Sequence, residues 1–283
     1  MMVKKIMSLI IFFIGAKAFC QHDEELFVFD YFMGISKENE STNTSNTRIT
    51  FNIPTIVGKS TLIHSLQFEN YKFNYDEQIA FNTSDIENIK SLSYGLTLKY
   101  PLDEEWHFTI HPNISMTSNH LTFTNELLLT GGVAIHKSNL KSETEIGIGY
   151  YTFLGKPRIL PKIKYTKKVA DNFAYTVGFP QSNVTYNYDT RSSFVSELNF
   201  KGTYAYINKP IVVDNSPIDK IEYSVVTFGL KYIRKLDLNW SFFIQTGGIL
   251  YNDYDLTKNT ALKVDIFRAP FISSGVTFNL NRK

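Results

Sequence analysis

The strongest constraint on the fold is a strict alternation of apolar and polar residues along Ser91–Met116. Every second residue from Leu92 to Tyr100 is apolar, the residues between them are small or polar, and the pattern resumes at Trp106 after a short polar turn. A period of two is typical of β-strands, because successive side chains point to opposite faces. Each arm has about ten residues, the length that a tilted strand needs to cross the hydrocarbon core of a bilayer. The segment therefore predicts an antiparallel hairpin whose apolar face lies against either a soluble core or lipid.

The N-terminal residues predict export. Lys4 and Lys5 precede the apolar run Ile6–Gly15, and small residues around Ala18 follow it. A basic start, a short apolar run and a small-residue exit are typical of a secretory signal peptide, and the run is too short for a spanning helix. We expect cleavage after Ala18 or after Cys20. Acylation of Cys20, as in a lipoprotein, is the alternative, but large residues stand where that signal needs small ones.

We therefore expect two parts of the chain, a signal peptide, residues 1–20, and one mature domain, residues 21–283, which the composition below identifies as an outer-membrane β-barrel domain. The sequence contains a single cysteine. If the cut follows Cys20, the mature chain has none, which excludes disulfides, zinc thiolates and thiol nucleophiles.

The apparent basic charge belongs to the signal peptide. Removing Lys4, Lys5 and Lys17 from the 29 basic residues leaves 26 against 27 acidic residues, a net charge of −1. We therefore expect neither nucleic-acid binding nor a polybasic membrane patch.

Composition favours the membrane interpretation of the alternating faces over the soluble one. Beyond the signal, no run approaches the roughly eighteen apolar residues of a spanning helix, yet aromatic residues make up 15% of the sequence. In an outer-membrane barrel half of each strand faces lipid and half faces a wet interior, so a slightly negative mean hydropathy is expected. The predicted fold class is all-β, a transmembrane up-and-down antiparallel β-barrel of about 14 strands, with 12 also acceptable. A secreted all-β protein is the alternative.

The alternation places the expected strands along the whole mature chain. They are Glu25–Ser36, Thr47–Val57, Thr61–Phe73, Ser91–Tyr100, Trp106–Met116, Asn125–His136, Ser142–Thr152, Arg158–Lys167, Asn172–Phe179, Ser192–Phe200, Thr203–Ile207, Lys220–Ile233, Leu238–Ile249 and Phe271–Leu280. The expected loops are Lys37–Asn46, Tyr75–Lys90 with a partly helical Asp85–Lys90, Asn208–Pro217 and Tyr251–Lys258.

An internal repeat tests this topology. The pattern L-D-x-x-W-x-F-x-I begins at Leu102 and recurs at Leu236, and a degenerate copy lies halfway between them, around Phe173. Trp106, Phe173 and Trp240 would each begin a strand after a tight turn at one membrane interface, where amphipathic rings settle. An even number of strands between copies returns the chain to the same side, as an up-and-down barrel requires.

With the apolar faces outward, the polar faces would line a lumen. The expected lumen residues are Ser91, Ser93, Thr97, Lys99, His107, Thr109, His111, Asn113, Ser115, Thr130, Glu143, Glu145, Lys162, Lys164, Asn172, Thr176, Lys231, Ser241 and Gln245. Both signs of charge occur, so strong selectivity for anions or cations is not indicated. Glu145 and Lys164 are expected to form a cross-strand pair.

His107 and His111 are the sharpest candidates for chemistry, since both should point inward from one strand. Residues four apart on a strand are roughly 13 Å apart, too far to share one metal ion. A metal site would need ligands from neighbouring strands that the sequence does not identify, and ordinary lumen polarity is the simpler explanation.

No established catalytic motif is present. The chain contains no P-loop, GxGxxG, GxSxG or CxxC, and Asp253 and Asp255 lack the remaining ligands of a calcium loop. We assign no catalytic, cofactor-binding or metal-binding residue and expect no cofactor.

Several features carry a resemblance to a family. They are the signal ending near Cys20-Gln21, the Leu-Asp-x-x-Trp-x-Phe hairpins, the segment Gly178–Ser182 and the closing Gly275–Leu280. The mature chain resembles an outer-membrane β-barrel family of Bacteroidota that carries only a domain-of-unknown-function label. The resemblance implies fold and location, and it supplies no catalytic residues.

The expected function is that of a passive pore, a small-molecule uptake barrel or a structural barrel in the bacterial outer membrane, with membrane lipid as its surroundings. Two alternatives remain: a barrel enzyme that modifies lipid or lipopolysaccharide, which needs a nucleophile beside a histidine at one rim, and a surface binding or adhesion module that uses its outward loops.

Overall fold

The computed structural model describes residues 25–35, 43–75, 82–122, 126–213, 216–257, 261–263 and 269–279. The predicted signal peptide lies outside these residues. The strands are β1 (Glu25–Gly34), β2 (Asn43–Val57), β3 (Ser60–Asn74), β4 (Asn88–Pro101), β5 (Trp106–Ser118), β6 (Leu128–Ser138), β7 (Ser142–Tyr151), β8 (Arg158–Ala170), β9 (Phe173–Phe179), β10 (Gln181–Asn187), β11 (Ser192–Val213), β12 (Ser216–Lys235), β13 (Trp240–Thr257), β14 (Ala261–Lys263) and β15 (Pro270–Asn279). Among these described residues there is no helix with the length and apolar character needed to cross a membrane.

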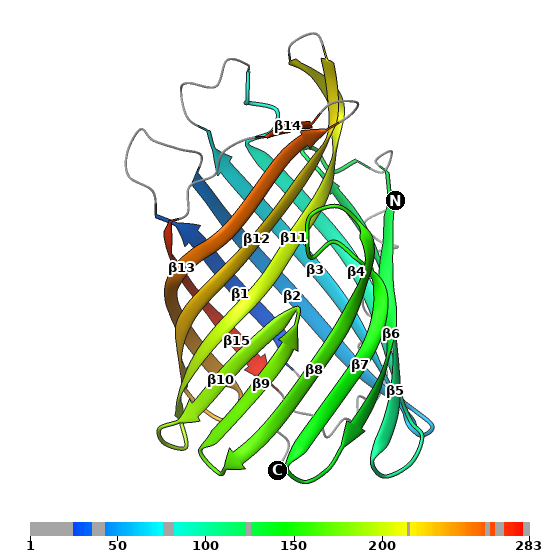
Figure 1. The fold of residues 1–283 in the computed structure, drawn as a ribbon, viewed down its shortest axis with the longest axis vertical. Helices are drawn as coiled ribbons and strands as arrows, with labels where there is room; N and C mark the ends of the chain where they lie inside the picture. The colour runs from blue at the N-terminus through cyan, green and yellow to red at the C-terminus, as the bar shows by residue number, and fades with distance from the viewer. Residues whose placement is uncertain are drawn as a thin grey trace, which may run out of the picture.

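The strands close into a barrel (Figure 1). Each strand from β1 to β12 pairs with the next one along the chain, and β15 completes the ring by pairing with both β13 and β1. Because β14 pairs, within the described part of the chain, only with the end of β13, the wall that the structure describes has fourteen strands. The predicted antiparallel barrel of about fourteen strands is confirmed.

The outer surface of the wall is apolar. On β12, Phe228 and Leu230 are 51% and 53% exposed, whereas the intervening inward residues are buried, as Thr227 is. The same exposure of large apolar side chains recurs around the ring. Examples are Phe51, Leu66, Tyr94, Ile146, Ile163 and Val177. The prediction that the apolar faces point outward is therefore confirmed for these strands.

Four turns at one end of the barrel, which we call the short-turn end, share one arrangement of hydrogen bonds. A side-chain oxygen of Asp103, Asn139, Asp189 or Asp237 accepts hydrogen bonds of 2.6 to 3.0 Å from the backbone N–H groups two and three residues later. Asp and Asn favour such turns because their side chains replace a backbone acceptor. These backbone N–H donors lower the pKa of the Asp189 and Asp237 carboxyls.

The repeated turn predicted from the sequence is confirmed. Trp106, Phe173 and Trp240 begin β5, β9 and β13, which are four strands apart. All three strands start at the short-turn end, as an even number of strands between copies requires.

The wall is lower on one side (Figure 1). β9 and β10 have only 7 residues each, against 22 in β11. Beyond their tip, the turn after β7 packs on β11, where the Thr152 hydroxyl donates to the Gly202 carbonyl at 3.2 Å. The end of β5 also reaches β11, because Ser118 pairs with Tyr206. At the other end, which we call the long-loop end, strands that are not neighbours elsewhere therefore meet.

Two strand predictions between β9 and β12 are wrong, although the total is right. β10 is not predicted, because only Val184 and Tyr186 in it are large and apolar. β11 is predicted as two strands that end near Gly202, whereas the structure shows Gly202 inside one continuous strand. A Cβ at Gly202 would collide with the backbone of the turn after β7. This glycine therefore marks a close approach of two backbones, not a strand end.

Some predicted loops are also wrong. Residues 84–86 form a turn and β4 begins at Asn88, so Asp85–Lys90 is not helical. Asp253 and Asp255 lie within β13, in register with Ser224 and Glu222 of β12.

The other differences from the predicted strands are that the observed strands are longer. β2 begins within the predicted loop Lys37–Asn46, and β11 and β12 occupy most of the predicted loop Asn208–Pro217.

The interior of the long-loop end is filled by buried apolar side chains, which we call the apolar plug. Its members are Phe73, Ile86, Ile89, Ala205, Ile207, Ile218, Ile221, Tyr223, Val225, Ile249, Tyr254, Leu256 and Phe271. They come from both sides of the ring and therefore meet across the lumen. The rings of Phe73 and Tyr254 lie 4.8 Å apart, and the hydroxyl of Tyr75 is hydrogen-bonded to that of Tyr254. Burial raises the pKa of the Tyr75 phenol. The expectation of a polar lumen is wrong for this half of the barrel.

Candidate functional site

The barrel encloses a polar cavity of about 430 Å³ between the apolar plug and the short-turn end. We call this cavity the chamber. Its charged lining residues are Asp30, Arg48, Glu69, Glu197, Lys201 and Lys231. A smaller cavity of about 50 Å³ lies where the chamber meets plug residues such as Tyr223 and Phe271. The three acidic and three basic side chains give the chamber a balanced formal charge.

One row of chamber charges crosses three neighbouring strands. In the strand register Arg48 of β2 lies opposite Asp30 of β1 and Glu69 of β3. The Arg48 guanidinium donates to the Asp30 carboxylate at 2.7 Å, and the Tyr71 hydroxyl donates to Glu69 at 2.8 Å. The pairing of β1, β2 and β3 places these three side chains next to one another, so the paired strands fix the positions of the charges.

A second row lies on β11, β12 and β13. The Lys231 ammonium lies 3.1 Å from one oxygen of Glu197, and the Gln245 amide donates to the other oxygen at 2.9 Å. Both oxygens of this buried carboxylate are therefore satisfied, as buried charge requires.

Lys201 differs from the other chamber cations. It lines both cavities and forms no ion pair with any residue that the structure describes. The charges of Arg48, Asp30, Glu69 and Glu197 act on its ammonium. The Lys201 ammonium is therefore available to interact with solvent or with a solute in the chamber.

A third charged group lies on β7 and β8. Glu145 and Lys164 lie opposite one another, as predicted, with 4.0 Å between their charged atoms. Lys162 is closer, at 2.7 Å from the other Glu145 oxygen. The predicted cross-strand pair is confirmed, and a second lysine strengthens it.

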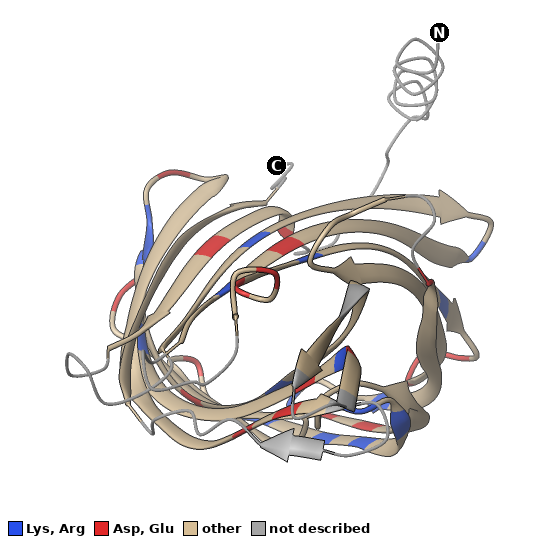
Figure 2. Ribbon diagram, turned by 90° about the horizontal axis from the view of Figure 1, so that it is seen from above, with Lys and Arg blue, Asp and Glu red and all other residues tan. Residues whose placement is uncertain are grey.

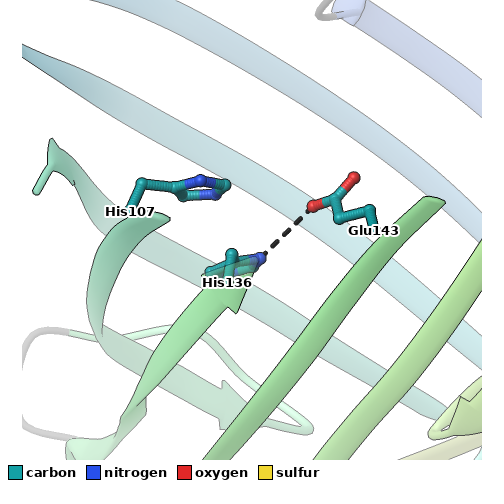
Figure 3. Close-up of side chains that lie close together, drawn as sticks. All are labelled: His107, His136 and Glu143. Carbon is teal, nitrogen blue, oxygen red and sulfur yellow. Dashed lines mark hydrogen bonds and ion pairs between the residues drawn. The ribbon is translucent and has the colours of Figure 1, made fainter. Parts of the chain in front are cut away.

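His107 lies in a cluster that the sequence analysis did not assemble. Its ring stacks on that of His136 in β6, with centroids 4.2 Å apart and planes inclined by 13°. The Nδ1 atom of His136 lies 3.3 Å from a carboxylate oxygen of Glu143 in β7. Figure 3 shows the carboxylate pointing toward the edge of the stacked pair. We call His107, His136 and Glu143 the histidine cluster.

His111 belongs to a different contact. Its Nε2 lies 2.7 Å from the Tyr151 hydroxyl, and the two rings stack at 5.5 Å. The two predicted histidines therefore serve separate neighbours and do not converge on one group.

Other predicted lumen residues form small polar pairs. Ser91 bonds to Thr117 at 2.8 Å, Asn113 donates to Thr130 at 3.2 Å, and Thr166 bonds to Thr176 at 3.0 Å. The prediction that Asn172 faces the lumen is wrong, because this residue is exposed in the turn between β8 and β9.

Of the chamber residues, Lys231 and Gln245 were predicted to line the lumen, but most of the other charged ones were not. Asp30 and Arg48 stood on the polar faces of predicted strands, and their alternation was a usable signal. Glu197 and Lys201 lay in the segment whose strands were misassigned. His136 was hidden because the connection from β5 to β6 is long, so that the register between them cannot be counted from a tight turn.

Several solved outer-membrane proteins are similar in structure to this chain. The KdgM porin in complex with disordered oligogalacturonate aligns over 90% of this chain and 99% of its own, with 9% identity and a TM-score of 0.40. The NanC porin aligns over 89% and 100%, with 10% identity and a TM-score of 0.41. The P. putida toluene transporter TodX aligns over 96% and 94%, with 7% identity and a TM-score of 0.42. The barrel assignment itself rests on the strand pairing of this chain.

Comparison of sequences gives the family. No curated protein matches the chain. A family model described as a domain of unknown function, DUF6268, matches residues 59–269, from the start of β3 to the last connection before β15. The protein therefore belongs to the DUF6268 family, for which no function is described.

Proposed function

We propose that this protein is an outer-membrane barrel that passes small polar solutes, and that the apolar plug closes its long-loop half in the resting conformation. The observation that carries the proposal is the chamber. A barrel that served only as a structural element could fill its interior with packed side chains, whereas about 430 Å³ of space lined by six charged residues is left here. Cavities of about 300–1,000 Å³ are the size that small ligands occupy.

The location follows from the same set of features. The apolar outer surface suits lipid, and short turns face the periplasm in barrels of this kind. We infer that residues 1–20 direct export, that residues 21–283 form the mature barrel, and that the source is a member of the Bacteroidota. The short-turn end, where β1 begins and β15 ends, would then face the periplasm.

The class of solute follows from the charge balance. Seen along the axis, acidic and basic residues share the wall (Figure 2). A chamber with equal numbers of acids and bases would neither repel nor concentrate one sign of ion strongly. Neutral or zwitterionic polar solutes fit this lining better than strongly charged ones.

Within the plug, the turn that carries Ile86 is the part that can move most easily for passage. Ile86 belongs to a turn, not to a wall strand, and the Asn119 amide donates to the Asp85 carbonyl beside it at 2.9 Å. Another hydrogen bond links the Phe73 amide to the Glu87 carbonyl at 2.8 Å. A turn held by a few such bonds can open at lower cost than a strand of the wall.

Conductance in a planar bilayer tests the proposal. We expect rare or small ohmic steps from the unaltered protein and frequent, larger steps from a Phe73→Ala, Ile86→Ala double variant. A Phe228→Ala variant, changed only on the outer surface, is the control and should behave as the unaltered barrel does. Silence of both the unaltered protein and the plug variant, with correct insertion, would favour a structural barrel.

The enzyme alternative receives no specific support from the two predicted histidines. His111 contacts a phenol, and His107 stacks on another imidazole. If a phospholipase or deacylase activity is found, alanine at these positions should leave it unchanged. The adhesion alternative would require binding to depend on residues 208–217 at the tip of β11 and β12.

A further inference from the structure

We propose that the histidine cluster is a binding site for a divalent transition-metal ion of the zinc class. His107, His136 and Glu143 each offer one ligand atom, and these atoms lie within 4.8 Å of one another. Two imidazole nitrogens and one carboxylate oxygen are a donor set that zinc uses in open sites, with a fourth position left for water. Calcium and magnesium prefer oxygen donors and fit this set poorly.

The backbone brings the three residues together. His107 lies directly opposite His136 in the pairing of β5 with β6, and Ser138 lies opposite Glu143 in the pairing of β6 with β7. The three ligands therefore come from three consecutive strands of one sheet. A site on paired strands is held more rigidly than a site on loops.

The distances are close to those that a metal requires. Two ligands bonded at about 2.05 Å to a tetrahedral ion are roughly 3.3 Å apart. The His136 Nδ1 and the Glu143 oxygen already stand at 3.3 Å, longer than the roughly 2.7–2.9 Å of a strong charge-assisted hydrogen bond. The third ligand must approach by a side-chain rotation.

His107 is free to make that rotation. It is only partly buried, and no hydrogen bond within the described residues holds its ring. Parallel rings direct their nitrogen lone pairs in parallel, so one ring must tilt before both can face one ion. The Nε2 of His136 has no hydrogen-bond partner among the described residues, so this ring is not locked by a second contact either.

The surrounding charge is mixed. Glu143 is itself a ligand, while Glu145 and Lys99 both act on His107. Glu145 is largely neutralised by Lys162 and Lys164. Lys99 opposes a bound cation, so the carboxylate of Glu143 is essential for affinity.

Titration calorimetry with zinc chloride tests the site. The full mature chain, purified in detergent, freed of any histidine tag and stripped with a chelator, should bind one zinc ion per chain. Cobalt chloride in place of zinc should give visible absorption bands of a site with fewer than six ligands. Calcium chloride should give no saturable heat.

Variants locate the binding. His136→Ala and Glu143→Gln should each weaken zinc binding by more than about tenfold. His107→Ala, at a less buried position, supplies the same test if His136→Ala does not fold. His111→Ala is the matched control, since it removes an imidazole from the same strand and should leave zinc affinity unchanged.

Absence of zinc binding by the unaltered chain, or equal weakening by His111→Ala and His136→Ala, would overturn the proposal. The measurement requires no conductance, so its outcome is independent of the solute-passing function.

Discussion

The two halves of the barrel interior differ in kind, although one alternating pattern runs through both. On β12 the inward residues Tyr223 and Val225 belong to the apolar plug, whereas Lys231, further along the same face, lines the chamber. Toward the long-loop end the inward side chains pack on one another across the lumen, and toward the short-turn end they form ion pairs around a cavity.

This difference teaches that alternation identifies the faces of a strand but not the environment of the inner face. An inner apolar residue and an outer one have the same period. They differ in their contacts, since Tyr254 is 1% exposed while Phe228 is 51% exposed. The barrel is therefore apolar on both faces near one end and apolar on one face near the other.

The largest expected effect is the difference in stability loss between a substitution inside the plug and one on the lipid-facing surface. Phe73→Ala should lower the free energy of unfolding by about 3–5 kcal/mol, because it leaves a cavity among side chains that cannot collapse fully. Phe228→Ala should cost less, about 1–2 kcal/mol, because lipid tails close over the gap. Urea unfolding in vesicles, followed by tryptophan fluorescence, measures both, and equal losses would break the comparison between the two environments.

A smaller effect is expected from the charges of the chamber. Asp30→Ala leaves Arg48 without its partner and should cost about 2 kcal/mol, since charged hydrogen bonds in a partly wet cavity are worth this much. The double variant Asp30→Ala, Arg48→Ala should recover part of the loss. The exposed pair of Glu105 and Lys137, 3.7 Å apart at a turn, is the control. Glu105→Ala should cost less than about 1 kcal/mol.

The chamber charges also set the ion preference of the conducting protein. With a tenfold gradient of potassium chloride we expect a reversal potential near zero, because acids and bases balance. Lys201→Glu should shift it toward the cation side, short of the roughly 59 mV of perfect selectivity. An unchanged potential in Lys201→Glu would mean that ions do not pass the chamber.

The smallest effect concerns the turns. Backbone N–H groups hold the pKa of Asp237 below its usual value, so its contribution to stability is fully present above the unfolded pKa of about 3.9 and is lost as pH falls through the lowered folded value. Asp237→Asn keeps the acceptor, as Asn139 does in its own turn, and removes the titration. Unfolding midpoints between pH 7 and pH 3 should therefore fall slightly less in Asp237→Asn than in the unaltered protein, and identical pH dependence would contradict this role.

The sequence predicted the parts of the fold that depend on local pattern. The outward faces and the positions of Trp106 and Trp240 follow from a period of two and from tight turns, which are local signals. The strand total is right because two errors cancel, since β10 is missed and β11 is divided into two. Lys201 and the apolar plug could not be predicted, because they depend on which strands face one another across the lumen.

The histidine cluster could also be predicted only in part. His107 was recognised as inward, and the distance argument that separates it from His111 agrees with their different partners. His136 and Glu143 could join it only once the register between β5 and β6 was known, and the long connection between these strands leaves that register open in the sequence.

Spin labels along β12 test the central claim most directly. A nitroxide placed in turn at Val225, Phe228 and Lys231, in the protein with Cys20 absent and reconstituted in vesicles, reports nearby oxygen, which concentrates in lipid, and nearby deuterated water. We predict high oxygen and little water at Phe228, little of either at Val225 in the plug, and water without high oxygen at Lys231 in the chamber. Water at Phe228, or equal exposure at Val225 and Lys231, would contradict a barrel with a lipid-facing exterior and an interior divided between plug and chamber.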